Sequence, residues 1–278
     1  MKKTETLINS ISSNKFITFS ELYKYRDLLY FMVLREVKVL YKQTVLGFSW
    51  AIIRPTISMI IFSIIFGNLA QIPSDGIPYP IFSYTALVPW TYFSTALTSA
   101  STSLVKNTSI FTKVYFPRLI IPITPVISGL VDFLISMSIV FVLMIYYGIS
   151  VTTNIIWLPV LIFIMILTSA GLGFWFSALA VQFRDIRYAV QFLSQLLMYA
   201  APVVWPASLL SEKFGEDIAF WYGLYPLVGV IEGFRSALIG KVPMPLEHIL
   251  LGSLTSFIIF ISGSFYFNKR EKFFTDVA

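Results

Sequence analysis

The sequence predicts an all-α, polytopic integral membrane protein, and three observations lead to this fold class. Residues 133–183 form a block of 51 residues without a charged side chain. Charged residues make up only 12% of the chain, against about 25% in globular domains. The mean hydropathy is +0.79. As one helix the block would extend about 75 Å, roughly twice the thickness of a hydrocarbon core. We therefore expect it to cross the membrane, turn at the polar break 147–154, and cross back.

The remaining charge-free stretches complete a set of six expected transmembrane helices. Their approximate ranges are 52–71, 80–103, 119–147, 155–181, 188–205 and 249–267. We expect one transmembrane domain over residues 1–278, with the uncharged block as its frame. The distribution of cations orients the spans. Sixteen lysines and arginines fall on the side of both termini and three on the other, so the positive-inside rule places both termini in the cytoplasm.

Residues 27–42 are too charged to span the membrane. Arg35, Lys38 and Lys42 fall at positions i, i+3 and i+7 on one face of a helix, and most apolar residues lie elsewhere around it. This pattern is typical of an amphipathic helix in the headgroups of the inner leaflet. An ordinary cytoplasmic helix packed on the protein is the alternative.

Two connecting segments are unusually apolar. The cytoplasmic loop 106–118 carries three cations, no acid and apolar residues expected to be exposed, so it is either a docking surface or a set of interfacial anchors. The outer segment 206–240 is too broken by Gly and Pro to span. We expect re-entrant helices there, between spans five and six. Glu232 and Arg235 are spaced i, i+3 and can pair.

Two charges fall inside expected spans. Arg54 lies near the inner boundary, where it can extend to the headgroups. Asp132 lies deeper, in span three, and is either an ion site or a hydrogen-bonded structural residue.

The sequence contains no signature of an enzyme. It has no phosphate-binding loop and no G-x-S-x-G elbow. It has no cysteine, and His248 is its only histidine, so a metal cluster is not expected. The function predicted is transport, driven by a gradient or by a partner.

Five short motifs resemble, in order, the type-2 ABC exporter permeases for polysaccharides, which serve O-antigen, capsule and teichoic acid export. The motifs are residues 44–50 (TVLGFSW), 111–118 (FTKVYFPR), 183–187 (FRDIR), 202–206 (PVVWP) and 225–240 (YPLVGVIEGFRSALIG). The resemblance covers nearly the whole chain. Tyr225 departs from it, because the family often has Asn at that position.

The resemblance implies a permease subunit in the cytoplasmic (inner) membrane. Two copies would form the pore, and each would dock one ATP-binding subunit. ATP and magnesium would be held by that subunit, with no cofactor in this chain. The substrate would be a lipid-linked polysaccharide. Coupling to the ATP-binding subunit would fall to Phe111, Lys113, Tyr115, Phe116, Arg118, Arg184 and Asp185.

Aromatic residues make up 17% of the chain, and their faces can stack on the C–H faces of sugar rings. Membrane-interface belts and packing are the alternative role. Our candidates for the pore or its gate are Phe62, Phe66, Tyr84, Trp90, Tyr199, Trp205, Glu232 and Arg235.

Three other functions compete with glycan export. An ion-coupled secondary transporter would use Asp132, but the sequence shows no internal repeat. A membrane glycosyltransferase or scaffold is disfavoured by the acid-poor cytoplasmic face. An ABC exporter of a small lipid or drug remains an alternative within the same family.

Overall fold

Every regular element of the computed structural model is a helix over the residues that the structure describes, which are 23–42, 44, 46–111, 115–271 and 274. The helices are α2 (Arg26–Lys42), α3 (Ser49–Phe62) with its π-helical extension η1 (Ser63–Leu69), α4 (Tyr79–Lys106), α5 (Thr108–Phe111), α6 (Ile120–Tyr146), the 3-10 turn η2 (Thr153–Trp157), α7 (Leu158–Gln182), α8 (Ile186–Ala200), α9 (Ser208–Phe214), α10 (Glu216–Tyr222), α11 (Pro226–Ile239) and α12 (Leu246–Arg270). The all-α prediction is confirmed.

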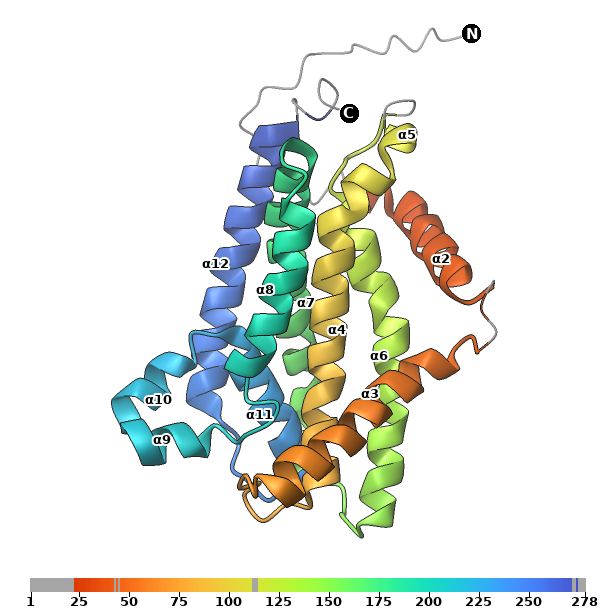
Figure 1. Ribbon diagram of the computed structural model, residues 1–278. Coiled ribbons are helices and arrows are strands. Elements are labelled where there is room, and N and C mark those ends of the chain that lie inside the picture. Colours follow the sequence, from red (N-terminus) through yellow and green to blue (C-terminus); the bar gives the residue numbers. More distant parts are fainter. Residues whose placement is uncertain (1–22, 43, 45, 112–114, 272–273, 275–278) are drawn as a thin grey trace, which may run out of the picture.

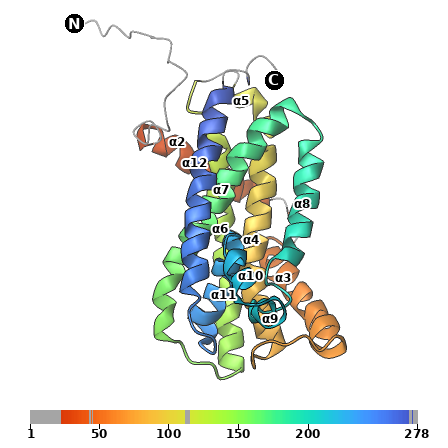
Figure 2. The ribbon, with the colours of Figure 1, turned by 90° about the vertical axis from the view of Figure 1, so that its left-hand side faces the viewer.

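The long helices form one bundle (Figure 1). Helix α7 packs most extensively against α12 and α4, and α4 also packs along α6. Helix α8 runs beside α4, while α3 crosses the bundle obliquely (Figure 2). One end of the bundle carries α5, the start of α6 and the end of α12, and we call it the α5 end. The opposite end carries α11, and we call it the α11 end.

Among the residues that the structure describes, four helical stretches are long and apolar enough to cross a membrane: Ser49–Leu69, Ile120–Tyr146, Thr153–Gln182 and Leu246–Arg270. The chain is therefore an integral membrane protein. The other two expected spans also form helices but do not meet this measure. Helix α8 has only 15 residues, against about 20 for a full crossing. Helix α4 has 28 residues, and ten of them are Ser or Thr. The count of six stays a prediction.

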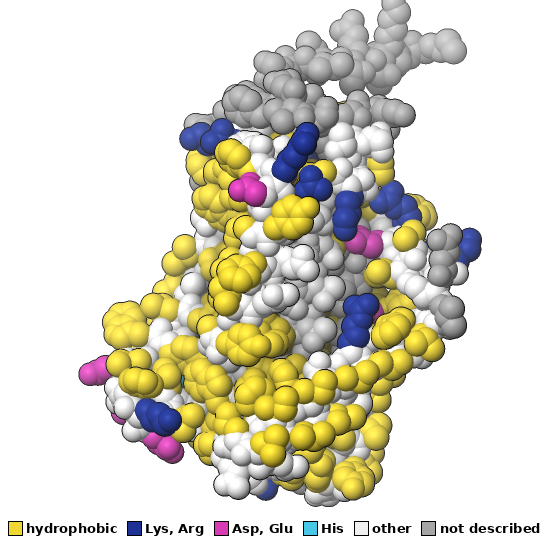
Figure 3. Space-filling model, viewed as in Figure 1, with side chains coloured by type: hydrophobic (Ala, Val, Ile, Leu, Met, Phe, Trp, Pro, Cys, Tyr) yellow, Lys and Arg dark blue, Asp and Glu magenta, His cyan; other side chains and the backbone are white. Residues whose placement is uncertain are grey.

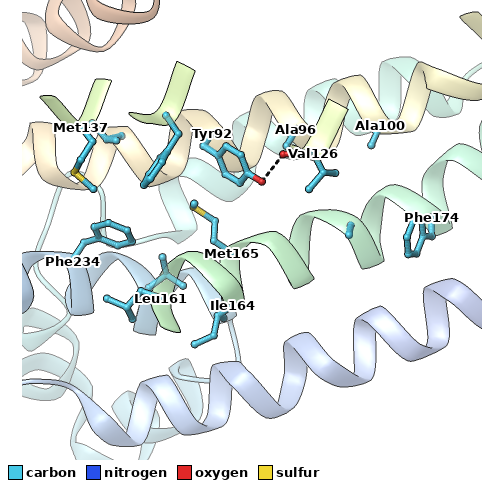
Figure 4. Close-up of a cluster of buried hydrophobic side chains, with 14 of the residues drawn as sticks. Tyr92, Ala96, Ala100, Val126, Met137, Leu161, Ile164, Met165, Phe174 and Phe234 are labelled. Atoms are coloured by element: carbon cyan, nitrogen blue, oxygen red, sulfur yellow. Dashed lines mark hydrogen bonds between the residues drawn. The ribbon is translucent and has the colours of Figure 1, made fainter. Parts of the chain in front are cut away.

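The expected hairpin of spans three and four is present as α6 and α7, and both helices contribute side chains to the hydrophobic core. Helix α6 ends at Tyr146, and Gly148 adopts a positive φ of 65° in the turn before η2 and α7. Helix α7 supplies Leu161, Met165 and Phe174 to the apolar centre of the bundle (Figure 4). On the α4 side, the Tyr92 hydroxyl donates to the Val126 carbonyl of α6 at 2.8 Å.

Glycine lets α7 and α12 approach to backbone contact. A Cβ added at Gly263 would lie 2.3 Å from the Gly171 carbonyl oxygen, and one added at Gly171 would lie 2.7 Å from the Phe260 Cα. Nearby, the hydroxyls of Thr168 and Ser256 are 2.8 Å apart across the same contact. Close packing of small residues and interhelical hydrogen bonds replace the hydrophobic driving force that helices lack in lipid.

We predict that Gly263→Ala destabilises the bundle by about 1–3 kcal/mol, because the new methyl must push two backbones apart. Thermal unfolding in detergent would measure the loss. Gly129→Ala is the matched control, because a Cβ there lies at an ordinary 3.5 Å from Tyr92. The control should be neutral or slightly stabilising, since alanine favours helix over glycine. Equal stability of Gly263→Ala and wild type would contradict this packing argument.

Candidate functional site

The connection between α4 and α6 lies at the α5 end and corresponds to the predicted docking loop (Figure 1). Tyr115 is 76% exposed. Phe116 is only 4% exposed and belongs to the hydrophobic core, so our expectation that its side chain is exposed is wrong. The aromatic ring is buried because it packs among the apolar side chains of the core. Lys113 and the side chain of Phe111 lie outside the described residues.

Arg118 ties this connection to the end of α12. Its Nη1 donates to the Glu271 carbonyl, and its Nε lies 4.0 Å from the Glu271 carboxylate. The side chain is 16% exposed. Arg118 therefore holds the start of α6 against the end of α12, whatever else it contacts.

The second predicted coupling segment is the turn between α7 and α8, and it lies at the same end of the bundle (Figure 1). Phe183, Arg184 and Asp185 are all exposed there. The Asp185 carbonyl accepts from the backbone amides of Tyr188 and Ala189 and so starts α8. The fold thus places both sequence-predicted coupling segments on one end, although they are about 70 residues apart in the chain.

Helix α2 is linked to both the docking loop and the middle of α6. Arg35 Nη2 donates to Asn107 Oδ1 at 2.9 Å. Burial raises the pKa of Glu36, and the nearby Arg35 and Lys106 cations oppose that shift. At the other end of α2, the Tyr41 hydroxyl donates to the Asp132 carboxylate. Asp132 therefore has a hydrogen-bonded partner, in line with the structural role that the sequence left open.

At the α11 end, Glu232 and Arg235 form the ion pair expected from their spacing. Arg235 Nη1 lies 2.8 Å from Glu232 Oε1, and Arg235 is only 1% exposed. The guanidinium also donates to the Val203 carbonyl at 3.1 Å and lies 3.5 Å from the Phe82 ring centre. In turn, Glu232 accepts from the Ala207 backbone amide at 2.9 Å. The pair joins α11 to α4 and to the turn after α8.

The eight candidates for the pore or its gate differ in how far their side chains are buried. Tyr84 and Trp90 are buried within this chain, as are Glu232 and Arg235. Phe62 and Phe66 are half-buried and form an edge-to-face pair with ring centres 5.4 Å apart. The rings of Trp205 and Tyr222 are stacked, with their centres 5.7 Å apart, and Tyr199 is exposed. Of the eight candidates, Tyr199 offers the most open surface to a passing molecule.

Sequence reasoning missed two glutamines on α8. Gln191 and Gln195, one turn apart, are both exposed between Tyr188 and Tyr199, which are exposed as well. Helix α8 also exposes Phe192, Leu193 and Leu196, whereas the exposed side chains of α12 over residues 249–267 are all apolar: Leu250, Leu254, Phe257, Ile258, Ile261 and Phe265. Placing an amide group against lipid costs free energy, so the face of α8 that carries Gln191 and Gln195 should border protein or water. The i, i+4 spacing of the two amides was the signal available in the sequence.

No group of three His, Cys, Asp or Glu residues suited to a metal ion occurs in the part of the chain that the structure describes. The α5 end carries exposed connections between helices. The α11 end carries the buried Glu232–Arg235 ion pair and its hydrogen bonds. Such an arrangement can dock a partner at the α5 end and hold the turn after α8 in place.

Comparison with known proteins identifies the family. The model of the ABC-2 type transporter family matches residues 27–239, so the chain belongs to this family. The O-antigen export system permease protein RfbA of Myxococcus xanthus is 28% identical over 255 residues, which cover 91% of this chain and 96% of that protein. A protein of the same name from Klebsiella pneumoniae is 29% identical, with 90% and 95% covered. The polysialic acid transport protein KpsM of Escherichia coli is 24% identical, with 88% and 94% covered.

We predict that Glu232→Leu lowers the free energy of unfolding by about 3–5 kcal/mol, because it leaves the Arg235 charge buried without its partner. The double variant Glu232→Leu/Arg235→Met should lose less, since no unpaired guanidinium remains. Chemical or thermal unfolding in detergent would rank the two. Lys213→Met, which removes an exposed charge from the last turn of α9, is the control and should change little. A double variant less stable than the single one would argue against this account.

Proposed function

We propose that the chain is the permease subunit of an ATP-driven ABC exporter that moves a lipid-linked polysaccharide, of the O-antigen, capsule or teichoic acid type, across the cytoplasmic membrane. The observation that carries the proposal is membership in the ABC-2 type transporter family, combined with relatives named for O-antigen export and for polysialic acid transport that match 88–91% of the chain. Their coverage of nearly the full length means that the likeness is not confined to one motif.

In this proposal the chain forms one type-2 ABC transmembrane domain with six spans and both termini in the cytoplasm. The α5 end then faces the cytoplasm and the α11 end faces outward, with the segment between spans five and six as an outer re-entrant region. The burial of α11 supports the proposal of a re-entrant region, since all fourteen residues of this helix are buried in protein. Backbone at membrane depth that does not belong to a span requires such cover.

We assign ATP hydrolysis, with its magnesium, to a separate ATP-binding subunit, one for each of two permease copies. The absence of a phosphate-binding loop from the sequence supports this division. Tyr115, Arg184 and Asp185 are exposed at the α5 end and fit a docking role. The direct test of the function is export: a strain that lacks this chain should lose surface polysaccharide, and the intact chain should restore it.

We predict that Tyr115→Asp reduces copurification with the ATP-binding subunit severalfold, because a charge replaces a large apolar contact. Phe116→Asp is a poor test, since that residue is part of the core. The matched control is Tyr146→Asp, an equally exposed tyrosine at the opposite end of the bundle. Tyr146→Asp should leave copurification unchanged. Equal loss in both variants, or in neither, would count against docking at the α5 end.

The face of α8 supports a route for the glycan. Tyrosine rings can stack on sugars, and glutamine amides can exchange hydrogen bonds with sugar hydroxyls. Tyr188, Gln191, Gln195 and Tyr199 are all exposed on this helix, over about three turns. In the proposed dimer this face would border a wet path rather than lipid.

Cysteine labelling can test that path, because the chain contains no cysteine of its own. We predict that Gln191→Cys and Gln195→Cys react with a membrane-impermeant thiol reagent in the assembled exporter. Leu254→Cys and Phe257→Cys, on the apolar face of α12, are the controls and should react at least tenfold more slowly. Slow reaction at all four positions would rule out a wet α8 face without affecting the assignment of the exporter.

A further inference from the structure

Helix α2 carries a row of side chains along its outward face, one aromatic residue followed by three basic residues, which we call the stripe. Phe31, Arg35, Lys38 and Lys42 follow at positions i, i+4, i+7 and i+11, so they share one face of the helix. All four are exposed, and Phe31 is 65% exposed. Met32 is buried on the inner side, where α2 packs against α6. Hence α2 packs on the protein through its Met32 side, while its basic face points outward and Tyr30, Val39 and Leu40 are exposed as well.

The positive charge of this stripe is largely unneutralised. Arg35 donates to the Asn107 amide oxygen, which is uncharged. The side chains of Lys38 and Lys42 make no hydrogen bond or ion pair with another residue that the structure describes. Of the acids in α2, the exposed Asp27 lies on the same face four residues before Phe31, 3.8 Å from Arg26, and Glu36 is partly buried on the opposite face. Between Phe31 and Lys42 no carboxylate lies on this face.

The position of α2 brings the stripe to the edge of the apolar bundle. Helix α2 leads within seven residues into α3, whose outer face is apolar, with Ile57, Ile60 and Ile61 exposed. The space-filling view shows basic side chains on the side where α2 lies, next to a broad apolar surface (Figure 3). A surface in this position meets the headgroups of the leaflet at the α5 end.

We propose that the outward stripe of α2 binds anionic phospholipid headgroups of the surrounding membrane, through Arg35, Lys38 and Lys42, while Phe31 enters the boundary between headgroups and acyl chains. Charge complementarity selects an anionic headgroup, because three cations face outward from Arg35 to Lys42, while the acid on this face, Asp27, lies at the far end of the helix. The exposed Phe31 favours a lipid surface over water, since burying its ring at the interface removes apolar area from water.

This inference does not depend on which substrate is exported. The interaction would fix the depth and tilt of α2, which is attached to the docking loop through Asn107 and to α6 through Tyr41. Anionic lipid would therefore stabilise the connection between the α5 end and the first span.

The test is lipid binding by the purified full-length chain in neutral detergent. Dioleoylphosphatidylglycerol is added to one sample and dioleoylphosphatidylcholine to another, and retained lipid is counted by native mass spectrometry. We expect wild type to retain phosphatidylglycerol in preference, with the preference reduced at high salt. Lys38→Gln/Lys42→Gln should weaken phosphatidylglycerol binding about 25-fold, or about fivefold for each lysine. Phe31→Ser should weaken retention of both lipids.

The matched control is Lys38→Arg/Lys42→Arg, which keeps both charges and should bind as wild type does. Lys213→Gln removes one exposed lysine from α9, at the α11 end of the bundle, and should also bind as wild type (Figure 1). Unaltered thermal unfolding in phosphatidylcholine would show that the glutamine variant is folded. Undiminished phosphatidylglycerol binding by that variant would overturn the proposal. So would normal lipid binding together with loss of the ATP-binding subunit, which would make the stripe a protein-docking surface.

Discussion

The burial of the Arg235 charge inside an apolar bundle is the constraint on which the α11 end depends. A guanidinium that is 1% exposed must have its donors paired, and here Glu232, Val203 and the Phe82 ring surround it. These partners come from α11, the turn after α8, and α4. One ionic group thereby fixes three segments that are far apart in sequence, and the Tyr79 hydroxyl reinforces the turn through the Val204 carbonyl at 2.6 Å.

The two ends of the bundle are built differently, and this difference bears on transport. The turn after α8 is held by buried hydrogen bonds, whereas the turn before α8 is exposed and short. Between Ile186 and Leu196 only Val190 and Ser194 are buried. Helix α8 is therefore anchored within its own chain mainly at the α11 end. A partner that contacts Arg184 and Asp185 would act on the less constrained end of this helix.

Much of the fold follows from local sequence, and the misses have identifiable causes. The expected helix 119–147 is observed as Ile120–Tyr146, and 155–181 as the continuous stretch Thr153–Gln182. The expected helix 188–205 instead ends at Ala200, because the residue before Pro202 is disfavoured in a helix, and Ala201 is indeed extended. Phe116 was expected to be exposed because it lies in a basic loop. Neither the charge of a loop nor its position determines whether one of its rings points into the core.

The sequence by itself determined membrane residence, the helical class, the approximate helix ranges and the i, i+3 pairing of Glu232 with Arg235, because hydropathy and helical spacing are local properties. Only the tertiary structure decided that Arg235 reaches Val203 and Phe82, that Tyr41 meets Asp132, and that Gln191 and Gln195 stay exposed. Those outcomes depend on how helices cross, and crossings are set by side-chain volume at contacts such as Gly171 with Gly263, which join residues about 90 positions apart.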